Sequence, residues 1–369
     1  MYSQQELDDA VASGVITADA ANALRAHVSG QRSTAIPDEE QFRLITGFND
    51  IFVSIAAAIL LFAVGWIGQS IGQDTGLDVG EHGPSFIAPL GVAATSWGLA
   101  LFFTAKRRMA LPSILLLLSF VVGIFATTGL GIAQVLGEQA FDNNNLLAGS
   151  VIAVSGAVGA AAAFLHWRRF RVPITVAAGA ASAAAIAAGL VMAVLGPNDP
   201  NTSNIILGVI LALGIGIFLF AMWWDGSDRA RLTRRSDVAF WLHLLAAPMI
   251  VHPVFTLLGL NDGHATIGEG VVVILLYVAL GITALAIDRR ALLVSALAYV
   301  LFAMQQLFSQ FGAVELNVAL TALVIGSALL MLSAYWHQAR GLIVRPLPES
   351  LRDRLPILDR TVPAIQPAA

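Results

Sequence analysis

The stretch Phe42–Gly72, FRLITGFNDIFVSIAAAILLFAVGWIGQSIG, joins a polar N-terminal segment to a long apolar run. A helix needs about 20 apolar residues to cross about 30 Å of hydrocarbon, and this run is long enough. Phe42, Ile45 and Phe48 recur at helical spacing ahead of it, which is typical of an amphipathic turn at a membrane interface. The stretch therefore predicts the point where a water-exposed segment enters a membrane.

The composition of the whole chain supports the same interpretation. Of its 369 residues, 57% are hydrophobic and 12% are charged, whereas a water-soluble domain carries about 25% charged residues. Cysteine is absent, which excludes disulfides, thiolate metal ligands and cysteine nucleophiles. The first 41 residues contain no apolar run of the signal-peptide kind, so we expect the N-terminus to be retained.

Further apolar stretches follow the first, and together they predict about ten membrane-spanning helices. The runs are unbroken and lack the alternating pattern of membrane strands, so helices are expected. The predicted fold class is therefore all-α, a polytopic membrane bundle with a small N-terminal helical hairpin. The predicted spans are 51–72, 86–105, 111–136, 146–166, 172–195, 204–224, 238–260, 269–287, 291–311 and 314–335.

Charge predicts how the bundle lies in the membrane. All 20 basic residues fall in the N-terminal segment, in every second loop or in the C-terminal tail, and loops 73–85 and 196–203 contain none. Cytoplasmic loops accumulate Lys and Arg, so we predict that both termini lie in the cytoplasm. A count of ten spans satisfies this rule in every loop. The pattern predicts that residues 1–37 are a cytoplasmic hairpin and linker, 38–336 the membrane bundle, and 337–369 a cytoplasmic tail rich in Pro and Arg. We expect most of that tail to be poorly ordered. The composition, rich in Ala and with Lys106 as the only lysine, suggests a bacterium, so the predicted location is a bacterial inner membrane.

Two neighbouring spans are rich in small residues. Nine of the twelve residues from Ala177 to Ala188 are alanine, and Ser155, Gly156 and Gly159 lie close together in the preceding span. Small residues let helices approach closely in lipid, where packing holds them together. The pattern favours close packing within one chain over dimerisation.

Residues 3–29 predict two short helices around a tight turn. Gly14 suits the C-terminal cap of the first helix, and Thr17 suits the N-cap of the second. The run SQQELDDAVASGVITADAANALRAH, followed by a multi-pass body, resembles a family of predicted bacterial membrane proteins of unknown function that carry such a hairpin. The resemblance implies no activity, cofactor or site residue. The hairpin is either a docking or oligomerisation module for a protein partner or a solvated cap on its own bundle.

Charged residues are absent from the centres of the predicted spans. A charge there is costly and usually functional, so this argues against a proton-coupled pump built on a buried carboxylate. His243 and His252 both lie in the seventh predicted span. Their spacing, at about 100° per residue, puts them on opposite faces of a straight helix. We therefore expect no metal shared between them, and the sequence indicates no cofactor.

A set of uncharged polar residues falls in the outer half of the predicted bundle. These residues are Gln134, His252, Gln306, Gln310 and Asn317. Gln306 and Gln310 share a helix face through their four-residue spacing. The set predicts either an outward-facing substrate pocket or ordinary hydrogen bonds between helices, each contributing about 0.6 kcal/mol.

Motifs of enzyme chemistry do not occur in the chain. The sequence has no phosphate-binding loop, dinucleotide fingerprint or nucleophile elbow, so we predict no catalytic residues and no enzyme. The basic loop 225–237 is short and more typical of lipid contact than of nucleic-acid binding. Two functions stay open: a small-solute transporter or permease, and a membrane scaffold or sensor that acts through the hairpin. In both, the lipid bilayer is a partner, and the oligomeric state is open.

Overall fold

The described residues of the computed structural model are 10–24, 48–195, 201–229, 231, 233–259, 267–290, 293, 297, 323, 326–327 and 330–358. They fall into two units, one containing residues 10–24 and the other the residues from 48 to 358. Within these ranges the regular elements are helices, apart from an isolated bridge between Asp78 and Ser85.

The first unit contains a tight turn between two helical segments. Residues 10–12 and 18–24 are helical. Gly14 has a φ of 74°, the left-handed conformation that ends a helix at lowest cost in glycine. The Thr17 hydroxyl accepts a hydrogen bond from the N–H of Ala20 at 3.1 Å, which is an N-cap contact. The predicted turn and cap positions are confirmed, while the hairpin's location and role stay predictions.

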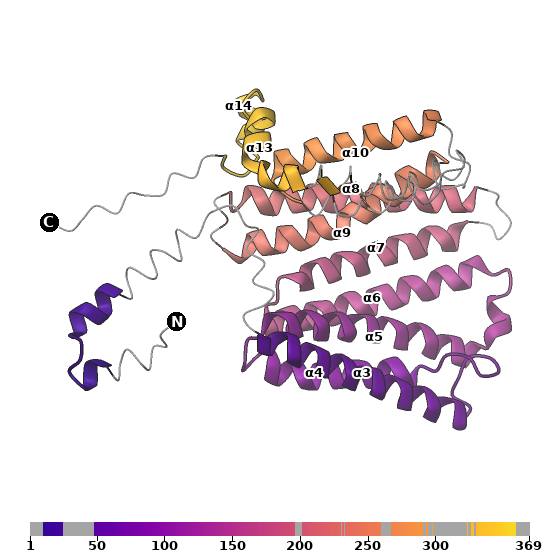
Figure 1. The fold of residues 1–369 in the computed structure, drawn as a ribbon. Helices are drawn as coiled ribbons and strands as arrows, with labels where there is room; N and C mark the ends of the chain where they lie inside the picture. Colours follow the sequence, from indigo (N-terminus) through magenta and orange to yellow (C-terminus); the bar gives the residue numbers. More distant parts are fainter. Residues whose placement is uncertain are drawn as a thin grey trace. The chain divides into compact units, whose positions relative to one another are not determined.

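The second unit is a bundle in which consecutive helices over residues 48–257 pack side by side (Figure 1). Within the described ranges its long helices coincide with the first eight predicted spans. They are α3 (Phe48–Asp74), α4 (Ile87–Phe103), α5 (Ala110–Leu136), α6 (Asn145–Phe170), α7 (Ile174–Val194), α8 (Thr202–Gly226), α9 (Arg234–Leu257) and α10 (Ile267–Ile287). A 3₁₀ turn, η1 (Glu138–Phe141), lies between α5 and α6. The predicted spans 291–311 and 314–335 lie almost entirely outside the described residues, so the count of ten stays a prediction.

Length and composition make six of these helices able to cross a membrane. They are α3, α5, α6, α7, α8 and α9. The apolar helix α4 is shorter, and α10 is apolar over Ile274–Ile287. Phe52, Phe62 and Trp66 of α3 are 64, 71 and 70% exposed, an arrangement that suits contact with lipid rather than water. The chain is therefore an all-α, multi-pass membrane protein.

Helices α6 and α7 pack at backbone distance because both present glycine at their crossing. A Cβ added to Gly149 would overlap backbone atoms of Gly189, and a Cβ added to Gly189 would lie 2.6 Å from the backbone N of Ala153. Such close approach increases van der Waals contact, which holds helices together in lipid. The close packing predicted within one chain from the small residues is confirmed.

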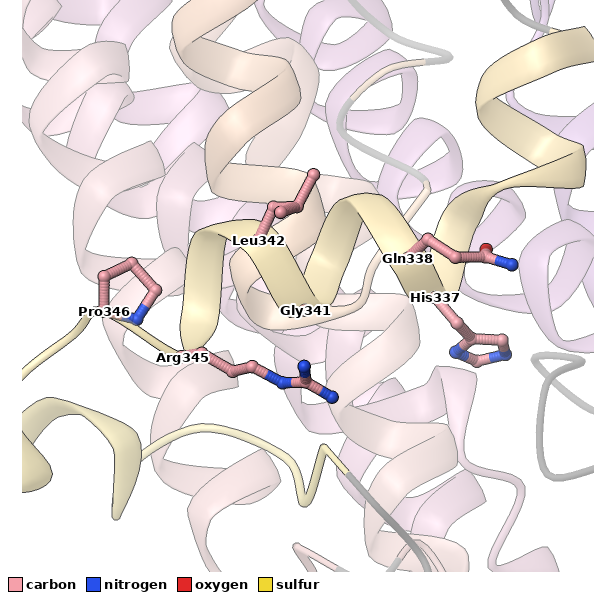
Figure 2. A pocket seen from close by; sticks show the side chains of 6 residues that line it. All are labelled: His337, Gln338, Gly341, Leu342, Arg345 and Pro346. Carbon is pink, nitrogen blue, oxygen red and sulfur yellow. The ribbon is translucent and has the colours of Figure 1, made fainter.

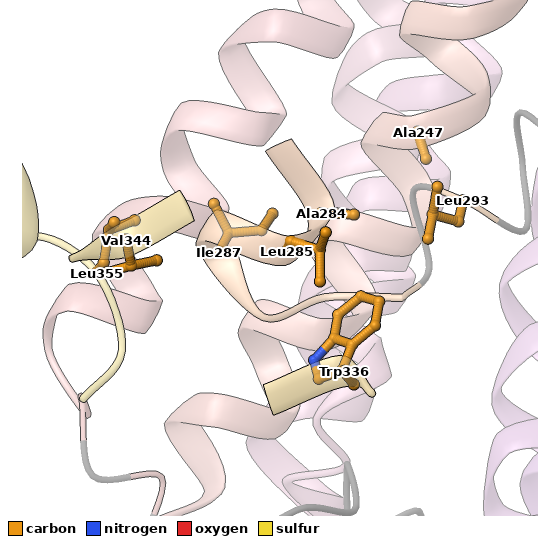
Figure 3. Packing of buried hydrophobic residues seen from close by; sticks show 8 residues of the cluster. All are labelled: Ala247, Ala284, Leu285, Ile287, Leu293, Trp336, Val344 and Leu355. Atoms are coloured by element: carbon orange, nitrogen blue, oxygen red, sulfur yellow. The ribbon is translucent and has the colours of Figure 1, made fainter. Parts of the chain in front are cut away.

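The C-terminal segment is folded as far as Leu358, so the expectation of a poorly ordered tail is wrong for residues 337–358. It contains α13 (Trp336–Val344) and a single turn, α14 (Glu349–Arg352). The prediction rested on Pro and Arg content, whereas three apolar residues of the segment, Trp336, Val344 and Leu355, are buried. Figure 3 shows this core cluster: Ala247, Ala284, Leu285, Ile287, Leu293, Trp336, Val344 and Leu355.

Candidate functional site

Asp225 lies in the last turn of α8, and only 2% of the residue is exposed. The sequence placed it in a loop after span 204–224, but the helix continues to Gly226. A carboxylate is therefore buried at a helix end, a position that the absence of charge from the centres of the predicted spans does not address. Burying a carboxylate is costly unless it is paired and hydrogen-bonded, so its partners define the site.

Two side chains hold the Asp225 carboxylate. His243 Nε2, on α9, lies 3.0 Å from Asp225 Oδ2. Arg289, just beyond α10, donates from Nη2 to Oδ1 and from Nε to Oδ2, the latter at 3.3 Å. Its Nη2 also donates to the Ser236 carbonyl at 3.0 Å. This two-point contact between guanidinium and carboxylate is the strongest form of such a pair. We call Asp225, His243 and Arg289 the Asp225 triad.

The triad is shielded from solvent and joins three helices. His243 is 0% and Arg289 3% exposed. The ring of Phe218 lies edge-on to the imidazole, with 5.2 Å between ring centroids. In the described part of the chain the Nδ1 atom of His243 is buried without a hydrogen-bond partner. A second proton on this imidazole would lack an acceptor, and Arg289 already balances the carboxylate, so the geometry favours a neutral histidine that donates from Nε2.

A second carboxylate, Asp288, precedes Arg289 and has its own partners. Arg231 Nη1 donates to Oδ2 at 2.8 Å, and the indole N–H of Trp336 donates to Oδ1 at 2.7 Å. Arg340 Nε lies 4.0 Å from Oδ1. Burial alone raises the pKa of Asp288, but the charges of Arg231 and Arg340 and the Trp336 hydrogen bond outweigh burial and hold that pKa below its usual value. We call these four residues the Asp288 cluster.

The turn that ends α10 supplies both carboxylate sites from adjacent residues. Asp288 has a φ of 57°, and Arg289 N–H donates to the Ala284 carbonyl at 2.8 Å. This is the Schellman closure of a helix, with aspartate in the left-handed position that glycine or asparagine usually occupies. After this turn Asp288 contacts α13 and the α8–α9 loop, while Arg289 contacts α8 and α9.

Arginines also tie the C-terminal segment to this end of the bundle. Arg340 is buried and donates from Nη2 to the Pro356 carbonyl at 2.7 Å and from Nη1 to the Ile357 carbonyl at 3.3 Å. Arg229, in the α8–α9 loop, donates to the Leu355 carbonyl at 3.0 Å. We call the Asp225 triad, the Asp288 cluster and these arginine contacts together the charge network. It continues from the interior of α8 and α9 to the C-terminal segment.

The exposed side of α13 carries a surface hollow of about 750 Å³ (Figure 2). Its described lining consists of His337, Gln338, Gly341, Leu342, Arg345 and Pro346. The opposite side of the helix buries Trp336, Arg340 and Val344. The hollow and the charge network therefore lie on opposite faces of α13.

The structure places two of the five predicted pocket residues. Gln134, near the end of α5, donates to the Gly76 carbonyl at 3.1 Å and so holds the α3–α4 loop. His252 is exposed whereas His243 is buried, so the two histidines lie on opposite faces of α9 as predicted. Gln306, Gln310 and Asn317 lie outside the described residues. The outer pocket stays a prediction.

Reasoning from the sequence did not identify Asp225, Asp288 and Arg289 as site residues. The available signal was an acidic residue directly after an apolar run, in WWDG at 223–226 and in AIDRR at 286–290. Both motifs lie next to basic residues, which indicate topology but not that the neighbouring aspartates are buried.

Comparison with protein-family models, with curated proteins and with solved structures finds no match. Fold and site therefore define the class of protein by themselves. It is an all-α, multi-pass membrane protein with a buried charge network at one end of α8, α9 and α10.

Proposed function

We propose that the protein is a small-solute transporter or permease of a bacterial inner membrane, with about ten spans and both termini in the cytoplasm. The observation that carries the proposal is the buried Asp225 carboxylate, shared between His243 and Arg289. Ionisable side chains inside membrane bundles usually mark ion or substrate pathways and proton relays. The alternation of basic loops along the chain supports the orientation.

In this proposal the Asp225 triad is a connection that the transport cycle makes and breaks. Asp225 carries the charge that holds Arg289, and Arg289 is attached to the end of α10. A proton on the carboxylate removes that charge, and a cationic group of the solute beside it competes with Arg289 for the same charge. Arg289 is then released and α10 is free to move against α8 and α9, which is the kind of helix movement that alternating access needs.

Solute-evoked current in proteoliposomes tests this function. The full-length protein is exposed in turn to amino acids, sugars, organic acids, nucleosides and organic cations, each with and without a pH gradient. We expect a current with one class, and we expect Asp225→Asn to abolish it in proteoliposomes that contain the same amount of folded protein. Asp142→Asn, which changes an exposed carboxylate, is the matched control and should transport normally. Transport by Asp225→Asn at the wild-type rate would refute the role of the triad.

A second candidate, a scaffold or sensor that acts through the N-terminal hairpin, is favoured by the exposed apolar side chains of the first unit. Val15 is 76% exposed and Leu24 39% exposed, as expected where a protein partner docks. Deleting residues 1–37 separates the two candidates. A transporter keeps its solute-evoked current after the deletion, whereas a scaffold gives no such current even at full length.

A further inference from the structure

Six basic side chains gather in and beside two loops at one end of the bundle. Lys106, Arg107 and Arg108 lie between α4 and α5, and Arg168, Arg169 and Arg171 lie at the junction of α6 and α7. All six are exposed. Across the described ranges, no carboxylate forms an ion pair with any of them. We call these six residues the basic surface.

The two loops lie near each other because side chains of the helices that lead into them are in contact. Phe170, at the end of α6, packs against the core cluster that contains Ala100 of α4, alongside Phe103. The rings of Trp97 and Phe170 have centroids 5.2 Å apart. Both loops lie at the same end of the bundle (Figure 1).

Aromatic rings hold four of the guanidinium groups in place. The distances from guanidinium carbon to ring centre are 5.5 Å for Arg107 on Phe102, 5.9 Å for Arg168 on Phe164, 5.5 Å for Arg169 on Phe170 and 5.8 Å for Arg171 on Trp167. A ring contacts the flat face of the guanidinium and leaves its N–H edge available to an acceptor. The rings therefore position the charges and leave their donors free.

Backbone conformation points to the same use of charge. Arg108 and Arg171 have φ of 53° and 56°, in the left-handed region that glycine and asparagine occupy at lower cost. The chain places an arginine at this position in each loop and pairs neither with a carboxylate. By contrast, Arg231 and Arg289 form ion pairs with carboxylates, so their charges are already balanced within the protein.

We propose that the basic surface binds the phosphate groups of anionic phospholipids. The loops flank the ends of membrane-spanning helices, which places them at headgroup depth, and Phe102 and Phe164 beside them are 43% and 58% exposed. Exposed phenylalanine rings suit contact with the acyl chains just below the headgroups. Guanidinium groups pair well with phosphate oxygens, and clusters of basic residues at this depth attract anionic lipid. The proposal is independent of transport.

Native mass spectrometry of the full-length protein with equal amounts of phosphatidylglycerol and phosphatidylcholine tests the proposal. The wild-type protein should retain phosphatidylglycerol in preference to phosphatidylcholine. The test variant carries Arg107→Gln, Arg108→Gln, Arg168→Gln and Arg169→Gln. It should lose that preference by about tenfold or more, because each basic residue near an anionic membrane surface raises the affinity for lipid about fivefold. The control removes three exposed arginines of the C-terminal segment, with Arg345→Gln, Arg352→Gln and Arg354→Gln, and should keep the preference.

A lysine variant keeps the test valid if the glutamine variant does not fold. Replacing the same four arginines by lysine keeps the charge and should keep most of the preference. The proposal is overturned if wild type shows no preference, if the folded glutamine variant keeps it, or if the control loses it equally. Inorganic phosphate that displaces phosphatidylglycerol at millimolar concentration would also overturn the assignment to lipid.

Discussion

Replacing Arg289 with glutamine should destabilise the fold strongly, because the change leaves a buried carboxylate without its main counter-charge. The side chains of Arg289 and Asp225 are 4% and 1% exposed, so water cannot replace the lost contacts. Removing one partner of such a buried pair costs about 3–5 kcal/mol of the free energy of unfolding. Arg289→Gln also loses the hydrogen bond to the Ser236 carbonyl, which adds to the effect in the same direction.

The matched control is an arginine–carboxylate pair on the surface. Arg352 and Glu349 lie 3.5 Å apart with side chains 43% and 88% exposed, and exposed pairs of this kind contribute little because water and salt screen them. Arg352→Gln should therefore change the free energy of unfolding by less than about 0.5 kcal/mol.

The assay is reversible unfolding in mixed micelles of mild detergent and dodecyl sulfate, followed by circular dichroism. Measuring Asp225→Asn, Arg289→Gln and the double variant gives the coupling between the two residues. The double variant removes both charges, so it should lose clearly less than the sum of the single variants. Additivity within about 0.5 kcal/mol would refute the conclusion that the two residues act as one buried pair.

Three further predictions concern the rest of the structure. The folded-state pKa of Asp288 lies below its unfolded value, so its contribution to the free energy of unfolding is complete above about pH 4 and is lost as pH falls through the folded pKa. The difference in stability between wild type and Asp288→Asn should therefore be constant at neutral pH and shrink in acid. A difference that grew in acid would contradict this assignment. Gly189→Ala places a Cβ 2.6 Å from the backbone of α6 and should cost about 1–3 kcal/mol by overpacking, while Gly208→Ala, which meets nothing within 4 Å, should be neutral or stabilising in thermal unfolding. Leu355→Ala removes a side chain from a residue that is 8% exposed and should cost about 2–5 kcal/mol, whereas Leu351→Ala, at a position 49% exposed, should have little effect; equal, small effects would show that the C-terminal segment is not packed.

The helices were predictable because the property that defines a span is local. An apolar run long enough to cross the bilayer is recognised from the sequence without knowing which helices pack against it. The first eight predicted spans coincide with α3 to α10. The turn at Gly14 and the cap at Thr17 are equally local, since each depends on a few adjacent residues. The close contact between α6 and α7 was also legible, because glycine and alanine patterns mark where helices can approach.

The charge network was decided only by the tertiary structure. Asp225 and Arg289 are 64 positions apart, and His243 lies on a third helix, so no sequence window contains the site. In the sequence, these residues read as loop charges and a polar residue in a span. The same holds for the C-terminal segment, whose Pro and Arg content indicated disorder until Arg340 and Leu355 proved to be buried. Whether a charge is solvated or buried depends on which helices pack around it, and hydrophobic length along the chain carries no information about that.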